Sequence, residues 1–171
     1  VSPSAEPKKL EITDETFKKP NASEKADYEE YAELMKAMGI KLDGKSGDAK
    51  LTRLEFAKMM LAFSGDSPDL TEYRTKEYFS DLPKSNKESG YANYAKEKGW
   101  IVEKEDGKFM PEESVLPRDI APAAVKLLGY NTYYRIPDNS DLSVYLSRAM
   151  QLGIFNGVPK SAQTEGMTYK D

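Results

Sequence analysis

Residues 51–65 read LTRLEFAKMMLAFSG and residues 115–129 read VLPRDIAPAAVKLLG, and these two stretches decide the fold. They align without gaps, and each ends in a glycine, which readily takes the left-handed conformation that closes a helix. Thr52 and Glu55 have the spacing of a capping box, in which each side chain accepts a hydrogen bond from the other residue's backbone N–H. We place the two predicted helices near residues 53–64 and 119–128.

Both predicted helices carry an apolar stripe at helical spacing. The stripe positions are Phe56, Met59, Met60 and Phe63 in the first, and Ile120, Ala123, Ala124 and Leu127 in the second. Pro117 at the first helical position costs little, because its missing N–H would have had no partner there. Pro122 falls inside the second helix, where a proline costs about 3 kcal/mol, so we expect a kink or a late helix start there.

A second element occurs three times along the chain. Residues 31–40, 91–100 and 145–154 read YAELMKAMGI, YANYAKEKGW and YLSRAMQLGI, each with a tyrosine followed eight positions later by a glycine. This spacing predicts three short helices whose tyrosines serve in packing. We place these helices near residues 24–38, 87–98 and 141–152.

The repeated elements predict how the chain is divided. A tail at residues 1–23, rich in proline and small polar residues, precedes repeats at 24–66, 67–130 and 131–171. The capping motif returns at Thr168 and Asp171, so we expect the third repeat to be truncated and to leave an apolar strip. We expect a second molecule, or the segment that holds Leu10, Ile12 and Phe17, to cover that strip.

Composition excludes several classes of function. The 171 residues include no cysteine and no histidine, which removes disulfide scaffolds, thiolate catalysis, the commonest general base and the commonest metal ligand. The 25 basic and 29 acidic residues are interleaved, so we expect no nucleic-acid partner. No apolar run approaches the roughly 20 residues that a membrane span needs. The acids fit helix ends and solvated faces, so we expect no enzyme, metal or cofactor.

Several motifs together resemble the S-layer homology family. They are LTRLEFA at 51–57, FSDLP at 79–83, DGKFMPEESV at 106–115 and LGY at 128–130, and the resemblance covers about residues 16–171. It implies a mostly α fold of three helix–loop–helix repeats, packed with pseudo-threefold symmetry and with few or no short strands. It also implies non-covalent anchoring of an exported bacterial protein to anionic secondary cell-wall polysaccharide, on the extracellular cell surface.

The resemblance further implies a glycan site. In the family a signature arginine lies in grooves between repeats and holds an acidic sugar substituent, and Arg53 occupies that position here. A guanidinium offers a planar, charged fork to a carboxylate. The second repeat has Pro117 at this position with Arg118 one residue later, and the third has Tyr169 followed by Lys170.

The candidate glycan-binding residues are Arg53, Thr52, Glu55, Trp100 and Arg118. Thr52 and Glu55 serve either as helix caps or as ligand groups, and Trp100 either stacks on a sugar or fills the space between repeats. We expect the fold to survive Arg53→Ala, because Thr52 and Glu55 would still cap the helix. Two of the three signature arginines are replaced. The alternative function is therefore a degenerate module, a spacer or protein-interaction platform without glycan affinity.

Overall fold

The computed structural model describes residues 28–37, 39–40 and 45–171. Within these ranges the chain forms eight α-helices, one turn of 3-10 helix and no strand, which confirms the mostly helical class. The elements are α1 (Tyr28–Ala37), α2 (Arg53–Ser64), α3 (Leu70–Arg74), α4 (Ser89–Glu97), η2 (Glu105–Gly107), α5 (Pro117–Leu127), α6 (Tyr130–Tyr133), α7 (Leu142–Gln151) and α8 (Ala162–Glu165). The predicted tail at 1–23 and the segment with Leu10, Ile12 and Phe17 lie outside the described residues.

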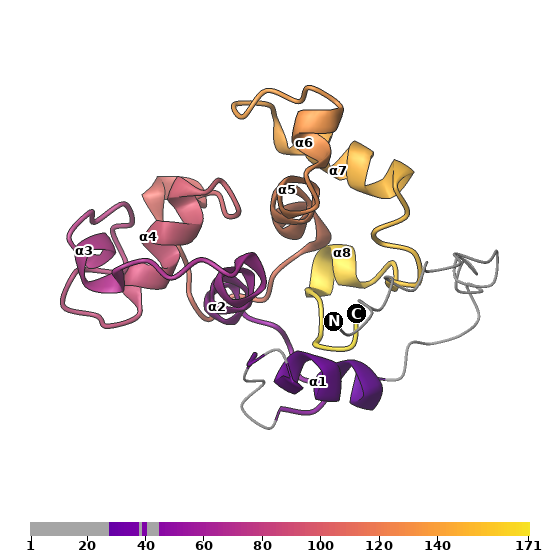
Figure 1. Ribbon diagram of the computed structural model, residues 1–171, viewed down its shortest axis with the longest axis horizontal. Helices are drawn as coiled ribbons and strands as arrows, with labels where there is room; N and C mark the ends of the chain where they lie inside the picture. The colour runs from indigo at the N-terminus through magenta and orange to yellow at the C-terminus, as the bar shows by residue number, and fades with distance from the viewer. Residues whose placement is uncertain (1–27, 38, 41–44) are drawn as a thin grey trace, which may run out of the picture.

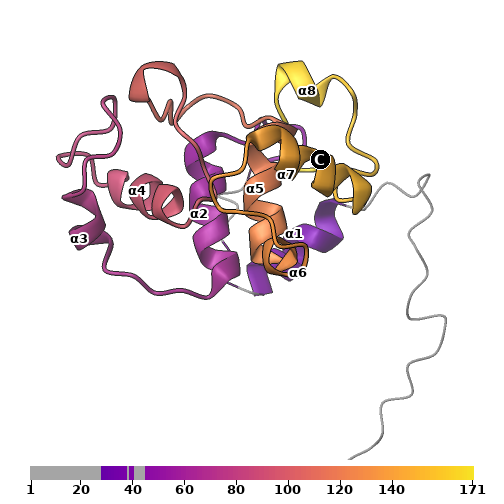
Figure 2. The same cartoon turned by 90° about the horizontal axis from the view of Figure 1, so that it is seen from above.

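The helices form groups around α2 and α5 (Figure 1). Helix α4 packs against both α2 and α3, whereas α6 and α7 pack against α5. Helices α2 and α5 lie next to each other in both views, with α3 and α4 on one side and α7 on the other (Figure 2). None of the described helices combines the length and apolar character that a membrane span requires.

The ends of α2 are closed as its sequence predicts. The Glu55 N–H donates to Thr52 Oγ1 at 3.2 Å, and the Thr52 N–H donates to Glu55 Oε2 at 2.9 Å. Gly65 follows the helix with φ of +70°, in the left-handed region that favours glycine. The predicted capping box is therefore confirmed.

Helix α5 begins earlier than its internal proline led us to expect. It starts at Pro117 and continues through Pro122, so a late start is wrong, and the alternative, a kink at Pro122, stays a prediction. Proline has the φ of a helical first turn already built in, and Leu116 donates its N–H to Asp119 Oδ2 at 3.1 Å just before it. The hydrogen bond from Leu116 to Asp119 and the proline at the first helical position together account for the start of the helix at Pro117.

The starts of the three sequence motifs meet through backbone hydrogen bonds. Leu51 N–H donates to Met167 O at 3.0 Å, Met167 N–H to Val115 O at 2.8 Å, and Val115 N–H to Leu51 O at 3.0 Å. The three residues thus close a ring in which each donates once and accepts once. Beside the ring, Thr168 N–H donates to Asp171 Oδ2 at 2.8 Å, as Thr52 does to Glu55.

Two clusters of buried side chains hold the helices together. The first joins α2, α4 and the 100–115 segment and contains Trp100, which is 5% exposed and meets Tyr94 edge-on with ring centroids 5.6 Å apart. The second joins α5 and α7 around Val125 and Tyr145, whose hydroxyl donates to Pro137 O at 3.1 Å. Trp100 and Tyr145 thus pack in the interior, whereas Tyr31 has a side chain outside the described part.

Candidate functional site

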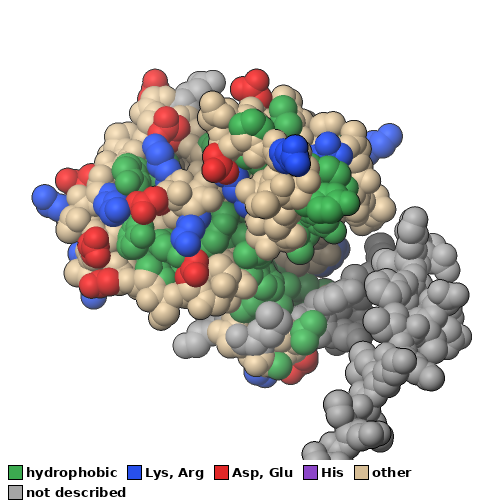
Figure 3. Space-filling model, turned by 45° about the horizontal axis from the view of Figure 1, so that its top comes forward, with side chains coloured by type: hydrophobic (Ala, Val, Ile, Leu, Met, Phe, Trp, Pro, Cys, Tyr) green, Lys and Arg blue, Asp and Glu red, His purple; other side chains and the backbone are tan. Residues whose placement is uncertain are grey.

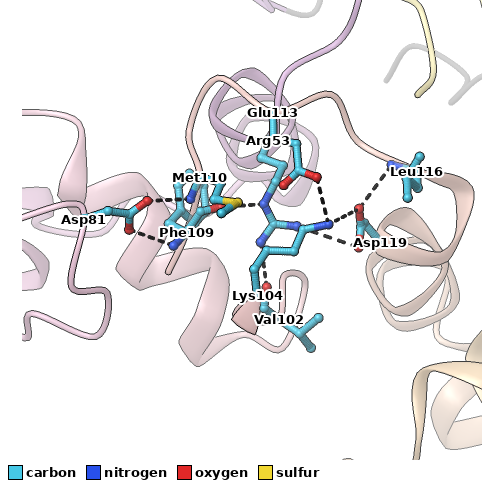
Figure 4. A network of polar contacts seen from close by, with 9 residues as sticks. All are labelled: Arg53, Asp81, Val102, Lys104, Phe109, Met110, Glu113, Leu116 and Asp119. Atoms are coloured by element: carbon cyan, nitrogen blue, oxygen red, sulfur yellow. Dashed lines mark hydrogen bonds and ion pairs between the residues drawn. The ribbon is translucent and has the colours of Figure 1, made fainter. Parts of the chain in front are cut away.

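Arg53, the signature arginine, lies in the interior of the protein. Its side chain is 0% exposed, although Arg53 is the first residue of α2 and follows its cap. Nε donates to Phe109 O at 2.6 Å and Nη2 donates to Val102 O at 2.6 Å (Figure 4). The resemblance assigns this guanidinium to a sugar carboxylate. Here two of its three nitrogens, Nε and Nη2, donate to backbone carbonyls of the protein itself.

Charged side chains surround the same guanidinium. Arg53 Nη1 lies 3.7 Å from Asp119 Oδ1, and Asp119 is only 3% exposed. Lys104 Nζ lies 3.2 Å from Asp119 Oδ2 and 3.6 Å from Glu113 Oε1, so two cations face two carboxylates (Figure 4). Burial lowers the pKa of Arg53, and the nearest carboxylates, Asp119 first among them, oppose that shift. With Asp81 also close enough to act on Arg53, the carboxylates of the cluster outnumber its cations.

Asp81, from the FSDLP motif, holds the loop that covers Arg53. Its carboxylate accepts the backbone N–H of Phe109 at 2.7 Å and that of Met110 at 2.8 Å (Figure 4). Met110 has φ of +55°, a conformation uncommon outside glycine, and these two hydrogen bonds help to hold it. Asp81 therefore fixes the position from which Phe109 presents its carbonyl to Arg53.

The five predicted site residues are not gathered in one cleft. Arg53 and Trp100 are buried, Thr52 and Glu55 are half-buried at the start of α2, and Arg118 is exposed on α5. A ligand would reach Arg53 only if the 102–113 segment moved. Glycan binding by these residues stays a prediction.

An open groove of about 520 Å³ runs along α2. Of the predicted residues, Glu55 is the one that lines it. Its lining is Gly39, Ile40, Glu55, Lys58, Met59, Leu61, Ala62, Gly65, Asp66, Ser67, Tyr91 and Tyr169. Residues far apart in the chain thus contribute to one concave surface, with apolar side chains between two tyrosines and charges near both ends of α2.

The charged groups in the groove are held in fixed places. Burial alone would raise the pKa of Glu55, but hydrogen bonds from Lys45, Thr52 and Tyr169 outweigh it and lower that pKa. Lys58 Nζ lies 2.8 Å from Glu88 Oε2 and 5.5 Å from the centre of the Tyr91 ring. At the far end, hydrogen bonds from Tyr94 and then Lys98 lower the pKa of Asp66. The groove therefore offers fixed acceptors, one cation and aromatic rings.

Sequence reasoning missed the groove residues Lys58, Tyr91 and Tyr169 as site candidates. Tyr91 was visible as a repeated tyrosine, and Tyr169 stands at the arginine position of the third motif, but neither pattern indicates which residues meet in space. In the part of the chain that the structure describes, no group of three or more acidic side chains could hold a metal ion.

Comparison with known proteins adds no relative. No family model matches the chain, and no curated protein or solved structure matches it either. The resemblance to the S-layer homology family therefore rests on the sequence motifs quoted above and stays a prediction.

Proposed function

We propose that the chain is a module of the S-layer homology type, with three repeats at 24–66, 67–130 and 131–171 around an approximate threefold axis. The hydrogen-bond ring of Leu51, Val115 and Met167 supports this proposal. Each of these residues precedes the capping position of one motif copy, and each has the same relation to the next. A ring of this kind is expected of three equivalent units, and not of units stacked in a line.

We propose that this module anchors an exported bacterial protein, without a covalent bond, to anionic secondary cell-wall polysaccharide at the cell surface. The observation that carries the proposal is the groove along α2. Its lining combines residues of the proposed first repeat with Tyr91 of the second and Tyr169 of the third. The groove therefore lies between repeats, the place that the resemblance implies for the glycan.

The chemistry of the groove suits a sugar chain. Tyrosine rings can stack on the apolar faces of sugar rings while their hydroxyls form hydrogen bonds. Lys58, which pairs with Glu88 here, could exchange that partner for a carboxylate of the glycan. Ser67 and the carboxylates of Glu55 and Asp66 can bond to sugar hydroxyls. In this proposal Arg53 acts as a positioning residue, because it fixes the N-terminal turn of α2 from which Glu55 enters the groove.

The test is co-sedimentation with purified Gram-positive cell-wall sacculi. We expect wild type to bind and Tyr91→Ala to lose about tenfold or more in affinity, which corresponds to about 1.4 kcal/mol. Lys58→Gln should lower binding and also make the remainder less sensitive to salt. Lys160→Gln, at an exposed loop lysine, is the matched control and should bind like wild type.

The burial of Arg53 favours a second candidate, the spacer or interaction platform without glycan affinity. In that case wild type would not sediment with sacculi, and its partner would be another surface protein or a second copy at the third repeat. Sacculus binding that is equal in wild type and in Tyr91→Ala would instead remove the groove from the proposal.

A further inference from the structure

Arginine and tyrosine side chains form an exposed plate where α6 meets α7. The guanidinium carbon of Arg148 lies 4.0 Å from the centre of the Tyr134 ring. Tyr134 meets Tyr133 edge-on, with ring centroids 4.8 Å apart, and Tyr133 is 77% exposed. Green and blue side chains share the upper right of the molecule in Figure 3, the side on which Figure 1 places α7.

Arg148 is oriented, yet it has no carboxylate partner among the described residues. Its Nη1 donates to Gln151 Oε1 at 2.9 Å, and the Tyr134 ring supports one face of the guanidinium. The described residues form twelve ion pairs, and Arg148 takes part in none of them. A stacked guanidinium of this kind keeps further N–H donors for an incoming carboxylate.

A shallow groove of about 290 Å³ adjoins Arg148 on α7. Its lining is Ser143, Val144, Ser147, Arg148 and Gln151. Apart from Arg148 these side chains are uncharged, and three of them carry hydroxyl or amide groups. The volume lies just below the range of about 300–1,000 Å³ for small-molecule sites, which suits a ligand no larger than a single sugar ring. Hydroxyls, an amide, one cation and an exposed aromatic ring together form the set of groups that recognises an acidic sugar.

We propose that this α6–α7 plate binds a carboxylate-bearing sugar residue. Arg148 receives the carboxylate, Ser143, Ser147 and Gln151 bond to hydroxyls, and Tyr133 supports the apolar face of the ring. This inference rests on the proposed function, because a site for an acidic sugar would serve a protein that binds the wall polysaccharide. It assigns the wall glycan a second point of contact, in the third repeat and separate from the groove along α2.

The test uses a galacturonic acid trimer and its carboxyl-reduced, neutral counterpart as probes, with calorimetry on the full chain. We expect the acidic trimer to bind about tenfold tighter than the neutral one, as a charged hydrogen bond would require. Arg148→Gln should abolish that difference, whereas Tyr133→Ala should weaken both trimers alike. Tyr133 is exposed and Arg148 is half-buried, so Tyr133→Ala should keep the wild-type melting temperature and Arg148→Gln should lower it only slightly. Lys160→Gln should leave both affinities unchanged.

The outcomes separate this inference from the proposed function. Absence of binding by the acidic trimer at millimolar concentration, or binding that Arg148→Gln leaves unchanged, overturns the second site. If sacculus binding then still depends on Tyr91, the proposed function stands without it. If the trimer binds through Arg148 but sacculi do not sediment the chain, the plate is a sugar site and the anchoring function fails.

Discussion

At the scale of single residues, Arg53 connects distant parts of the chain. It joins the start of α2 to the carbonyls of Val102 and Phe109 and faces Asp119 on α5. The motif around Arg53 could be read from the sequence, since Thr52 and Glu55 mark the helix start. Its burial could not, because the residues that enclose it come from about 50 or more positions later and arrive only with the tertiary fold.

This environment reverses the expectation that the fold tolerates Arg53→Ala. The substitution would leave the buried carbonyl of Phe109 and the half-buried carbonyl of Val102 without donors, and Asp119 with Lys104 as its remaining cation. We therefore expect a loss of about 3–5 kcal/mol in the free energy of unfolding, measured by urea denaturation. Arg118→Ala, on the exposed side of α5, should change stability by less than about 0.5 kcal/mol. A similar small change for Arg53→Ala would show that the cluster does not hold the fold together.

Glu55 predicts a specific dependence of stability on pH. Its pKa lies below the ordinary value of 4.5 in the folded protein, because hydrogen bonds that favour the carboxylate outweigh burial. The carboxylate therefore stabilises the fold fully above the unfolded-state pKa, and this contribution is lost as pH falls through the folded-state pKa. The stability difference between wild type and Glu55→Gln should be largest near neutral pH and shrink below about pH 4.5.

Denaturant titrations of the two proteins between pH 3 and pH 7 would measure that difference. A Lys160→Gln control should run parallel to wild type over the whole range. A constant difference between Glu55→Gln and wild type would mean that Glu55 has the same pKa in the folded and unfolded chains.

At the scale of helices, length decided what the sequence could predict. The described helices of nine or more residues, α1, α2, α4, α5 and α7, were all expected from repeated motifs and glycine ends. The shorter helices α3, α6 and α8 were missed, since each spans five residues or fewer and carries no full period of apolar spacing. Their positions depend on neighbours, as when Asn93 Nδ2 of α4 donates to Tyr73 O of α3 at 2.9 Å.

The close contact between α3 and α4 predicts the effect of Gly90→Ala. A Cβ at Gly90 would stand 2.5 Å from the backbone oxygen of Leu70, which cannot move without moving α3. Alanine ordinarily favours a helix over glycine by up to about 1 kcal/mol. Here we expect a net loss of about 1–3 kcal/mol instead, from the shift that the clash forces. Lys87→Ala, at an exposed position before α4, is the control, and a stabilised Gly90→Ala would contradict the contact.

At the scale of the whole molecule, the sequence motifs suggested a division into repeats, which stays a prediction, but gave no indication of which surfaces would form. The three motif copies indicated which residues correspond, and Leu51, Val115 and Met167 are corresponding positions. The groove along α2 and the plate at α6–α7 combine residues whose spacing in sequence has no period, so pattern analysis had no means of joining them. Such surfaces arise when side chains from separate elements meet after folding.

The ring of Leu51, Val115 and Met167 predicts that the described body unfolds as one unit. In a closed ring none of the three amides can be freed without disrupting its neighbours, whereas in a linear array distant repeats open separately. Phe56→Leu, a core change in α2 expected to cost about 1–1.5 kcal/mol, should therefore lower the hydrogen-exchange protection of all three amides by the same free energy. Native-state exchange followed by NMR would measure this. Reduced protection at Leu51 with unchanged protection at Met167 would show that the repeats open independently, and would remove the support that the ring lends to a threefold arrangement.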